Sequence, residues 1–303
     1  MIGRGRSMKR HRQEMTECPE PSIRSPYVLS GCEMYRQRSV VSGLDYEIFV
    51  SVPDGEPPAS GFPVLYLLDG NSDFVTVSET VKRVSRRPQA TGISPSIVVG
   101  IGYPDTESYN IDRRQFDLTR HPADEAALPD ASSGVCGGQD AFVEFLRTQL
   151  LPHIETIYPA DPARRTLMGH SLAGYFVLDL MCSRPEMFSG YISFSPSIWW
   201  DRAGLMQAVA AIDRRLTRQH RLHISAGRWE QEIAPWQDRE SLTARYHHVR
   251  EARRMVDNAR EFADAIRVAI GEDAVKFEVG ADEDHSTIVT VMLCRALRFV
   301  GRR

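Results

Sequence analysis

One stretch of this 303-residue chain decides its predicted fold: Arg165-Thr166-Leu167-Met168-Gly169-His170-Ser171-Leu172-Ala173-Gly174-Tyr175. A short apolar run stops at Gly169, and a second apolar run begins at Tyr175. Small residues on both sides of Ser171 allow a strand and a helix to approach each other closely. The pattern predicts a strand, a sharp turn with Ser171 at its apex, and a helix.

This arrangement is typical of the nucleophile elbow of α/β-hydrolases. A serine hydroxyl becomes a useful nucleophile only when a base takes its proton. The prediction therefore demands a histidine and an acid that orients it. In α/β-hydrolases these follow in the chain order serine, acid, histidine.

The flanking sequence predicts a mainly parallel sheet. Residues 62–68, 96–102 and 190–195 are apolar runs typical of strands buried on both faces. Further strands are expected at 221–227 and 274–279, and helical stretches lie between the strands. This alternation predicts an α/β fold with helices flanking a central sheet. Residues 33–40 and 44–52 alternate in character and predict an antiparallel hairpin at the N-terminal side of the sheet.

We expect one α/β-hydrolase domain over residues 27–303. Residues 1–26 are basic without a following apolar core and are expected to form a disordered tail. Residues 103–138 are loop-rich and polar. A connection of that length in a compact domain is typical of a binding loop or lid.

Composition excludes several classes of function. The net charge is -3 and no basic patch is interleaved with aromatic residues, so no nucleic-acid partner is expected. No apolar run is long enough to span a bilayer. The cysteines are scattered without a Cys-x-x-Cys pair, which argues against a disulfide framework or a structural zinc site; they stand at positions 18, 32, 136, 182 and 294. We therefore expect a cytoplasmic protein without metal or cofactor.

In parallel α/β sheets, ligands bind outside the carboxyl ends of the strands. The residues at those ends are Asp69-Gly70-Asn71, Gly102-Tyr103, Ser171, Ser195-Pro196, Arg228-Trp229-Glu230 and Asp284-His285. His285 follows the last strand and precedes the terminal helix, which is the position of the base in an α/β-hydrolase.

The acid that would orient His285 has more than one candidate. Glu230 lies three residues past Gly227, at the end of the strand before a long helical crossing. Glu232 is the alternative, and a Ser-His dyad without an acid is a third possibility.

Acyl transfer also needs donors for the oxyanion of the tetrahedral intermediate. The backbone N–H of Leu172, directly after the serine, is the first expected donor. The second should come from Gly70 or Asn71 in the loop after the first buried strand. Asn71 could add its side-chain amide, or it could be an ordinary turn residue.

Tyr103, which lies at a strand end, is a candidate for binding the substrate. Two tryptophans and two arginines are further candidates. Trp199 and Trp200 either line an aromatic pocket or pack in the core or a lid. Arg113 and Arg114 either clamp an anionic substrate, or one of them pairs with Asp117 and holds the loop in shape. His170 is expected to be a packing residue.

The ordered set of motifs resembles the putative-esterase (esterase D-like) family of α/β-hydrolases. Within it the chain is most similar to the bacterial trilactone siderophore esterases that hydrolyse enterobactin, salmochelin or bacillibactin. The likeness covers about residues 33–300 and is carried by residues 63–71, 98–104, 113–119, 169–174, 193–200 and 284–285.

The resemblance implies hydrolysis of a carboxylic ester, with Ser171 as nucleophile, His285 as base and the N–H of Leu172 in the oxyanion hole. The partner it implies is a small-molecule ester. Two positions depart from the family pattern: Ala173 replaces the commoner glycine, and Arg120 replaces a proline. The membrane-anchor segment of some periplasmic relatives is also missing, which favours the cytoplasm.

Other functions fit the same fold. An acyltransferase, or a carbohydrate or feruloyl esterase, would use the same nucleophile. A binding module on an inactive hydrolase fold is the non-enzymatic alternative. It is disfavoured because the serine, the histidine and a candidate acid are all present.

Overall fold

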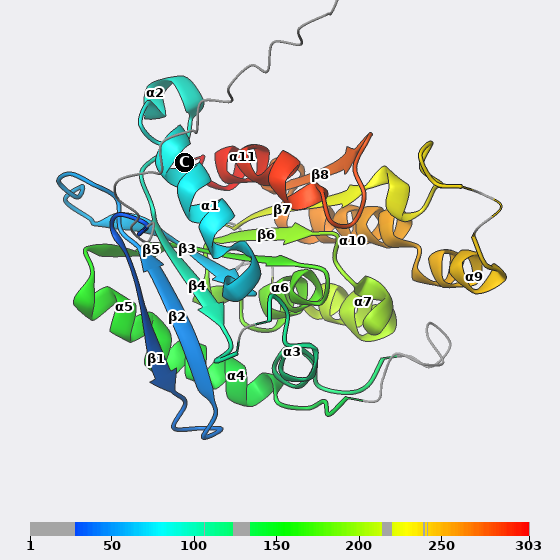
Figure 1. The fold of residues 1–303 in the computed structure, drawn as a ribbon, viewed down its shortest axis with the longest axis horizontal. Helices are drawn as coiled ribbons and strands as arrows, with labels where there is room; N and C mark the ends of the chain where they lie inside the picture. Colours follow the sequence, from blue (N-terminus) through cyan, green and yellow to red (C-terminus); the bar gives the residue numbers. More distant parts are fainter. Residues whose placement is uncertain are drawn as a thin grey trace, which may run out of the picture. The chain divides into compact units, whose positions relative to one another are not determined.

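An eight-stranded sheet in the order β1-β2-β4-β3-β5-β6-β7-β8 forms the centre of the fold (Figure 1). Strand β2 is antiparallel to both β1 and β4, and every other neighbouring pair is parallel. The predicted fold class is therefore confirmed: an α/β-hydrolase fold with an antiparallel N-terminal hairpin. The strands are β1 (Cys32–Arg38), β2 (Asp45–Ser51), β3 (Phe62–Leu68), β4 (Ile97–Gly102), β5 (Ala160–His170), β6 (Gly190–Phe194), β7 (Arg221–Gly227) and β8 (Val275–Gly280).

The computed structural model describes residues 28–105, 107–123, 134–213, 220–238, 240 and 242–302. The fold described below lies within the compact unit Gly31–Arg303. The predicted tail, residues 1–26, lies outside the described residues. None of the described helices is both long and apolar enough to cross a membrane.

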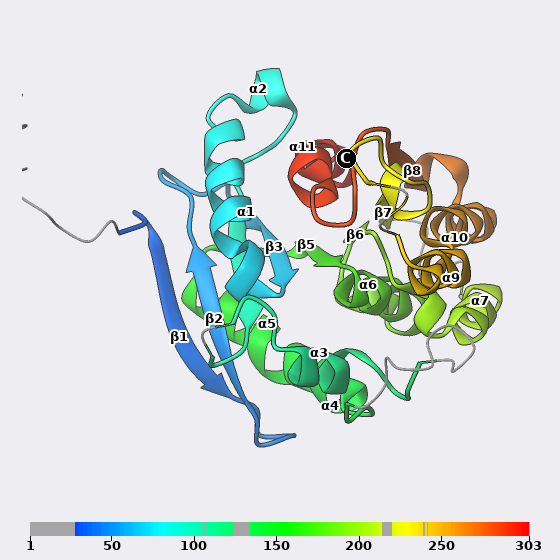
Figure 2. The same cartoon turned by 45° about the vertical axis from the view of Figure 1, so that its right-hand side comes forward.

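Helices cover both faces of the sheet (Figures 1 and 2). One face is covered by α1 (Gly70–Val84) and α11 (Ile288–Val300), and the other by α4 (Gln139–Phe145), α5 (Leu151–Ile157), α6 (Leu172–Ser183), α7 (Arg202–Ala211) and α10 (Met255–Ile270). Successive side chains of a strand point to opposite faces, so a strand between two helical layers must be apolar throughout. In β3, Tyr66 and Leu68 belong to one core and Leu65 and Leu67 to the other.

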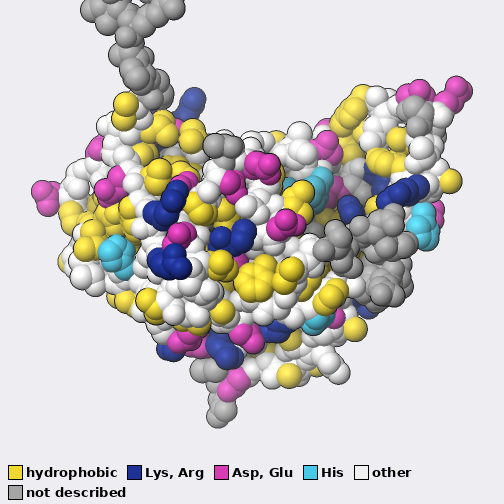
Figure 3. Space-filling view, turned by 60° about the horizontal axis from the view of Figure 1, so that its bottom comes forward, with side chains coloured by type: hydrophobic (Ala, Val, Ile, Leu, Met, Phe, Trp, Pro, Cys, Tyr) yellow, Lys and Arg dark blue, Asp and Glu magenta, His cyan; other side chains and the backbone are white. Residues whose placement is uncertain are grey.

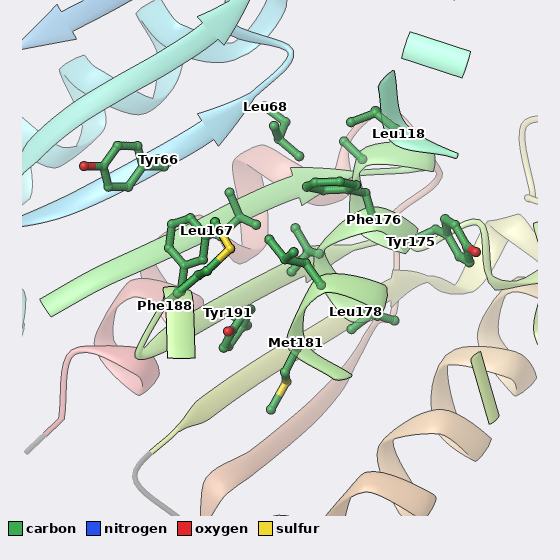
Figure 4. Packing of buried hydrophobic residues seen from close by; sticks show 14 of the residues in the cluster. Tyr66, Leu68, Leu118, Leu167, Tyr175, Phe176, Leu178, Met181, Phe188 and Tyr191 are labelled. Carbon is green, nitrogen blue, oxygen red and sulfur yellow. The ribbon is translucent and has the colours of Figure 1, made fainter. Parts of the chain in front are cut away.

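Helix α6 packs directly on the sheet, and all its residues from Ala173 to Met181 are buried. Figure 4 shows Phe176, Leu178 and Met181 of this helix in the same buried cluster as Leu167 of β5 and Tyr191 of β6. Burying each large apolar side chain contributes about 1.5–3 kcal/mol. This packing fixes the position of the N-terminus of α6, where Ser171 lies.

Two segments differ from the predicted pattern. The region expected to be loop-rich, residues 103–138, contains the helix α3 (Ile111–Leu118), whose N-terminus is capped by Asn110; residues 106 and 124–133 lie outside the description. The long helical crossing near 240–270 consists of two helices, α9 (Ala244–Arg253) and α10, because Arg254 adopts a left-handed conformation with φ of 42°.

The remaining short elements connect these layers. A π-helical turn joins α4 to α5 just before Pro152, whose ring cannot donate a backbone hydrogen bond. The short elements are α2 (Pro88–Thr91), η1 (Leu146–Leu150), η2 (Pro185–Met187), η3 (Ile198–Trp200), η4 (Arg228–Glu230) and η5 (Glu272–Ala274). On the face shown in Figure 3, basic and acidic side chains lie interspersed, in keeping with the small net charge.

Candidate active site

Ser171 occupies a strained turn between β5 and α6. Its φ of 61° and ψ of -118° lie outside the regions that non-glycine residues favour. Such a conformation costs on the order of 1–3 kcal/mol and persists only where its surroundings enforce it. Here the N–H of Ser171 donates to Phe194 O at 2.9 Å, and its carbonyl accepts from the N–H groups of Tyr175 and Ser197 at 3.0 Å.

Two glycines make this turn possible. A Cβ at Gly169 would lie 2.4 Å from the carbonyl oxygen of Ala173, and one at Gly174 would lie 2.9 Å from that of Phe194. Both distances are too short for any side chain. Strand β5 and helix α6 therefore approach each other closely, as the small residues predicted. Strand β6 also lies close to α6 at Gly174.

His285 and Glu230 form a hydrogen-bonded pair beside the turn. The Nδ1 of His285 lies 2.6 Å from Glu230 Oε2. An ionised carboxylate only accepts, so Nδ1 is the donor, and in a neutral imidazole Nε2 then keeps a free lone pair. Of the two candidate acids, Glu230 is the one that contacts His285. Glu232 instead pairs with Arg228 at 2.8 Å on the surface.

The Glu230 carboxylate is buried, with a side-chain exposure of 2% against 43% for His285. Its Oε1 accepts two further hydrogen bonds, from Ser195 Oγ at 2.5 Å and from the N–H of Gly227 at 2.6 Å. Ser195 itself has a φ of 44°. These contacts hold the carboxylate in one orientation toward His285.

The hydroxyl of Ser171 is hydrogen-bonded to Ser197 Oγ at 3.3 Å. No hydrogen bond joins it to His285 among the described residues. Catalytic hydrogen bonds are often long without substrate and tighten in the complex. Ser197, which is buried, was not singled out from the sequence, although it lies in the Ser-Pro-Ser run that follows β6.

His170 packs against His285, with 4.5 Å between the ring centroids. Burial lowers the pKa of His170 to about 3, and the adjacent His285 contributes to the lowering. Its Nε2 lies 2.7 Å from the carbonyl oxygen of His285 and must donate there. The neutral His170 thus holds the backbone of His285, the candidate base.

The candidate oxyanion donors differ in their surroundings. Leu172 begins α6, so its N–H has no partner within the helix. Gly70 packs against Gly100, where an added Cβ would lie 2.9 Å from the backbone. The side chain of Asn71 is occupied, because it accepts from the N–H of Tyr103 at 2.7 Å and donates to the carbonyl of Tyr103 at 2.9 Å.

Arg114 forms a bidentate ion pair with Asp69, at 2.6 and 2.9 Å. Its guanidinium also donates to the carbonyl of His170 at 3.5 Å. Burial raises the pKa of the Asp69 carboxyl, and the Arg114 guanidinium opposes that shift. The pair therefore ties α3 to the turn after β3 and to the end of β5.

Arg113 makes the ion pair with Asp117, at 3.4 Å. Its guanidinium lies over the rings of Tyr46 and Tyr103, 5.0 Å from each centroid. Arg113 and Tyr103 are not among the residues that line the cavity beside Ser171. The contacts of Arg113 are those of a residue that holds the loop in shape.

A cavity of about 610 Å³ opens beside Ser171. Trp199 and Trp200 both line it, and Trp200 Nε1 donates to the carbonyl of His121 at 3.0 Å. The wall contains Ile111, Arg114, Gln115, Ser171, Leu172, Ser197, Trp199, Trp200, Trp229, Glu230, Gln237, Tyr246, Val249, Arg250, Arg253, Met255, Asp284, His285 and Ser286. The cavity thus brings the serine, the histidine and the acid together with an aromatic wall.

Comparison with known proteins identifies the family of this chain. The family model "Putative esterase" matches residues 39–273. The chain belongs to this family. It is 32% identical over 297 residues to the ferri-bacillibactin esterase BesA of Bacillus subtilis (strain 168), covering 95% of this chain and 96% of the relative.

Two further relatives extend the likeness. The esterase is 30% identical over 274 residues to the siderophore enterobactin esterase of Emericella nidulans, covering 84% of this chain and 89% of the relative. The crystal structure of the BES protein from Bacillus cereus superimposes with a TM-score of 0.74 at 28% identity, covering 93% of this chain and 98% of that one. The protein is a carboxylic ester hydrolase.

Part of the esterase's cavity was not foreseen. Trp229, Tyr246 and Arg253 line it, and they come from η4 and α9, between β7 and α10. Only the position of Trp229, beside the candidate acid at a strand end, could have pointed to the cavity. A second cavity of about 530 Å³ includes residues at the opposite ends of the strands, among them Val64, Thr166 and Arg221. It contains none of the candidate catalytic residues.

Within the described ranges, no group of three or more His, Cys, Asp or Glu side chains could hold a metal ion.

Acid should destabilise the wild-type esterase more than a His170→Asn variant. The pKa of His170 is about 3 in the folded protein and about 6.5 in the unfolded chain. At pH values between these two, the unfolded chain binds the proton and the folded protein does not. Stability therefore rises with pH up to about 6.5. Between about pH 7 and pH 5 the wild type should lose about 2 kcal/mol through this group. Urea denaturation at both pH values measures the difference.

His248→Asn, at an exposed position on α9, is the matched control. It should lose as much stability on acidification as the wild type. Equal losses in the wild type and His170→Asn would show that burial of His170 does not depress its pKa.

Proposed function

We propose that the esterase is a serine hydrolase that works through an acyl-enzyme, with Ser171, His285 and Glu230 as its catalytic triad. One observation carries the proposal. A serine at a strained strand–helix turn shares a cavity with a histidine whose Nδ1 is held by a buried carboxylate. That combination activates a serine hydroxyl for nucleophilic catalysis.

In the first half-reaction, Ser171 Oγ attacks the ester carbonyl carbon while His285 Nε2 takes the hydroxyl proton. The new C–O bond forms as the carbonyl π electrons move to oxygen. When the tetrahedral intermediate collapses, the bond to the leaving alcohol breaks and His285 returns the proton to that alcohol. Glu230 keeps Nδ1 protonated and stabilises the imidazolium.

In the second half-reaction, water attacks the acyl-enzyme while His285 takes its proton. Collapse breaks the bond to Ser171 Oγ, which recovers its proton from His285. The carboxylic acid leaves, and the protein returns to its starting state.

The oxyanion would be held by the N–H of Leu172 at the start of α6, where the helix dipole favours negative charge. The second donor would be a backbone N–H of residue 70 or 71. Both residues lie at the start of α1, whose first N–H groups have no partner within the helix. The backbone N–H is favoured over the side-chain amide of Asn71, because that side chain is directed toward Tyr103, to which it donates one N–H and from which its oxygen accepts.

We propose a trilactone siderophore as the natural ester. Support comes from two relatives, which are a ferri-bacillibactin esterase and a siderophore enterobactin esterase. The cavity volume and its tryptophan wall suit an ester with aromatic acyl groups.

A cytoplasmic location is part of the same proposal. The four cysteines within the described ranges, Cys32, Cys136, Cys182 and Cys294, are free thiols, which suits a reducing compartment.

The esterase should hydrolyse p-nitrophenyl acetate or butyrate, and a fluorophosphonate should label it stoichiometrically at Ser171. Ser171→Ala should lower kcat at least about 10³-fold and abolish labelling, because it removes the hydroxyl at the apex of the strand–helix turn. Steady-state kinetics and mass spectrometry of the labelled peptide measure both effects. Full activity in Ser171→Ala would disprove the assignment.

Glu230→Gln and Glu232→Gln form a matched pair that tests the acid. Glu230→Gln should lower kcat about 10⁴-fold, because an amide no longer fixes the imidazole tautomer. Glu232→Gln should stay within about twofold of wild type, because its carboxylate pairs with Arg228 on the surface. Thermal melting checks that both variants fold. Similar kcat values in the two variants would favour a Ser-His dyad.

Enterobactin, offered with and without bound iron, should be cleaved to linear products that chromatography resolves. The aromatic cavity should give it a lower KM than p-nitrophenyl butyrate. Ser171→Ala serves as the control for spontaneous lactone opening. If neither form is cleaved, the siderophore proposal fails while the esterase assignment stands.

A further inference from the structure

Arg253 is a half-buried cation in the wall of the active-site cavity. Within the described part of the chain it has no carboxylate partner, and its Nε is buried without a hydrogen-bond acceptor. Burial alone lowers the pKa of its guanidinium. An arginine nevertheless keeps its charge at neutral pH.

The position of Arg253 is fixed by its neighbours. It is the last residue of α9, and the left-handed Arg254 follows it. Its carbonyl accepts from Asn258 Nδ2 at 2.9 Å, and its guanidinium lies over the Trp199 ring, 4.7 Å from the centroid. The aromatic face holds the charged plane in place without using its N–H donors.

The other arginines in the cavity wall already have oxygen partners. Arg114 is paired with Asp69. Arg250 donates to the hydroxyl of Tyr246 and to the carbonyls of Trp229 and Glu232, so it braces α9 against the segment after β7.

The carboxylates in the wall have partners as well. Glu230 holds His285. Asp284 accepts through one oxygen from the N–H groups of Ser286 and Thr287. Arg253 is therefore the arginine of this wall that lacks an oxygen partner among the described residues.

An unpaired guanidinium in a partly desolvated wall is destabilising unless an acceptor forms hydrogen bonds with its free N–H groups. The planar fork of arginine matches the paired oxygens of an anionic group better than any neutral acceptor. The partner missing from the protein can be supplied by a ligand in the same cavity.

We propose that Arg253 is a specificity residue that binds an oxygen anion on the substrate, so that the enzyme prefers negatively charged esters to neutral ones. This inference rests on the proposed esterase function and names the charge class of its substrate. The oxygen anion comes either from a carboxylate or from phenolate oxygens bound to ferric iron. Both are oxygen anions that a guanidinium can bind with two N–H groups.

The first arm of the test compares 4-nitrophenyl hydrogen glutarate with 4-nitrophenyl valerate. The two esters have the same acyl length, and only the glutarate carries a carboxylate. The second arm compares ferric enterobactin, which is anionic, with the iron-free form. In each arm the measured quantity is the ratio of kcat/KM for the charged ester to that for the neutral one. Arg253→Gln should lower this ratio about tenfold, mainly through KM.

Arg147→Gln is the matched control, because it also removes one positive charge but lies outside the cavity, where Arg147 pairs with Glu144. Its ratios should equal those of the wild type. Arg253→Lys keeps the charge without the planar fork and should give an intermediate ratio.

The arms also identify the source of the anion. A fall confined to the glutarate arm assigns a carboxylate, and a fall confined to the enterobactin arm assigns iron-bound phenolate. An unchanged ratio in both arms overturns the proposal.

A measurement on the wild type keeps the inference testable if Arg253→Gln does not fold. Benzoate should inhibit valerate hydrolysis competitively and about tenfold more strongly than benzamide, and added salt should weaken that preference. Equal inhibition by both compounds overturns the inference. If the wild type hydrolysed none of these esters, that result would instead contradict the proposed function itself.

Discussion

The buried carboxylate of Glu230 is the constraint on which the candidate site depends. A charge with so little exposure to water must be surrounded by donors, and this one has three: Ser195, Gly227 and His285. They come from the ends of β6 and β7 and from the turn after β8. Satisfying one carboxylate therefore requires three strand ends to meet. The strained backbone of Ser195 is one cost of that convergence.

Much of this arrangement could be predicted because it follows from local patterns and strand order. The small residues around Ser171 define the turn, and the position of His285 after the last strand brings it to the same edge of the sheet. The choice between Glu230 and Glu232 could not be made in this way. It depends on the short η4 turn, which directs one side chain inward and the other, two residues later, to the surface.

Contacts between distant segments also escaped prediction. The partner of Arg114 is Asp69, 45 residues earlier in the chain, and nothing in the local sequence indicates that pairing. The break between α9 and α10 was missed because arginine rarely adopts the left-handed conformation found at Arg254. That break directs the chain so that α9 contributes Tyr246 and Arg253 to the cavity wall.

Helix α9 contributes to the cavity wall and yet buries none of its own residues. Its attachment includes the three hydrogen bonds of Arg250 to the hydroxyl and carbonyl groups around it. The helix can therefore change in sequence or length at little cost to the packing of the central sheet. Evolution can in this way alter which esters are accepted while the residues around Ser171 remain the same. The turn at Ser171 and the part of the cavity wall that α9 supplies thus belong to different segments of the chain.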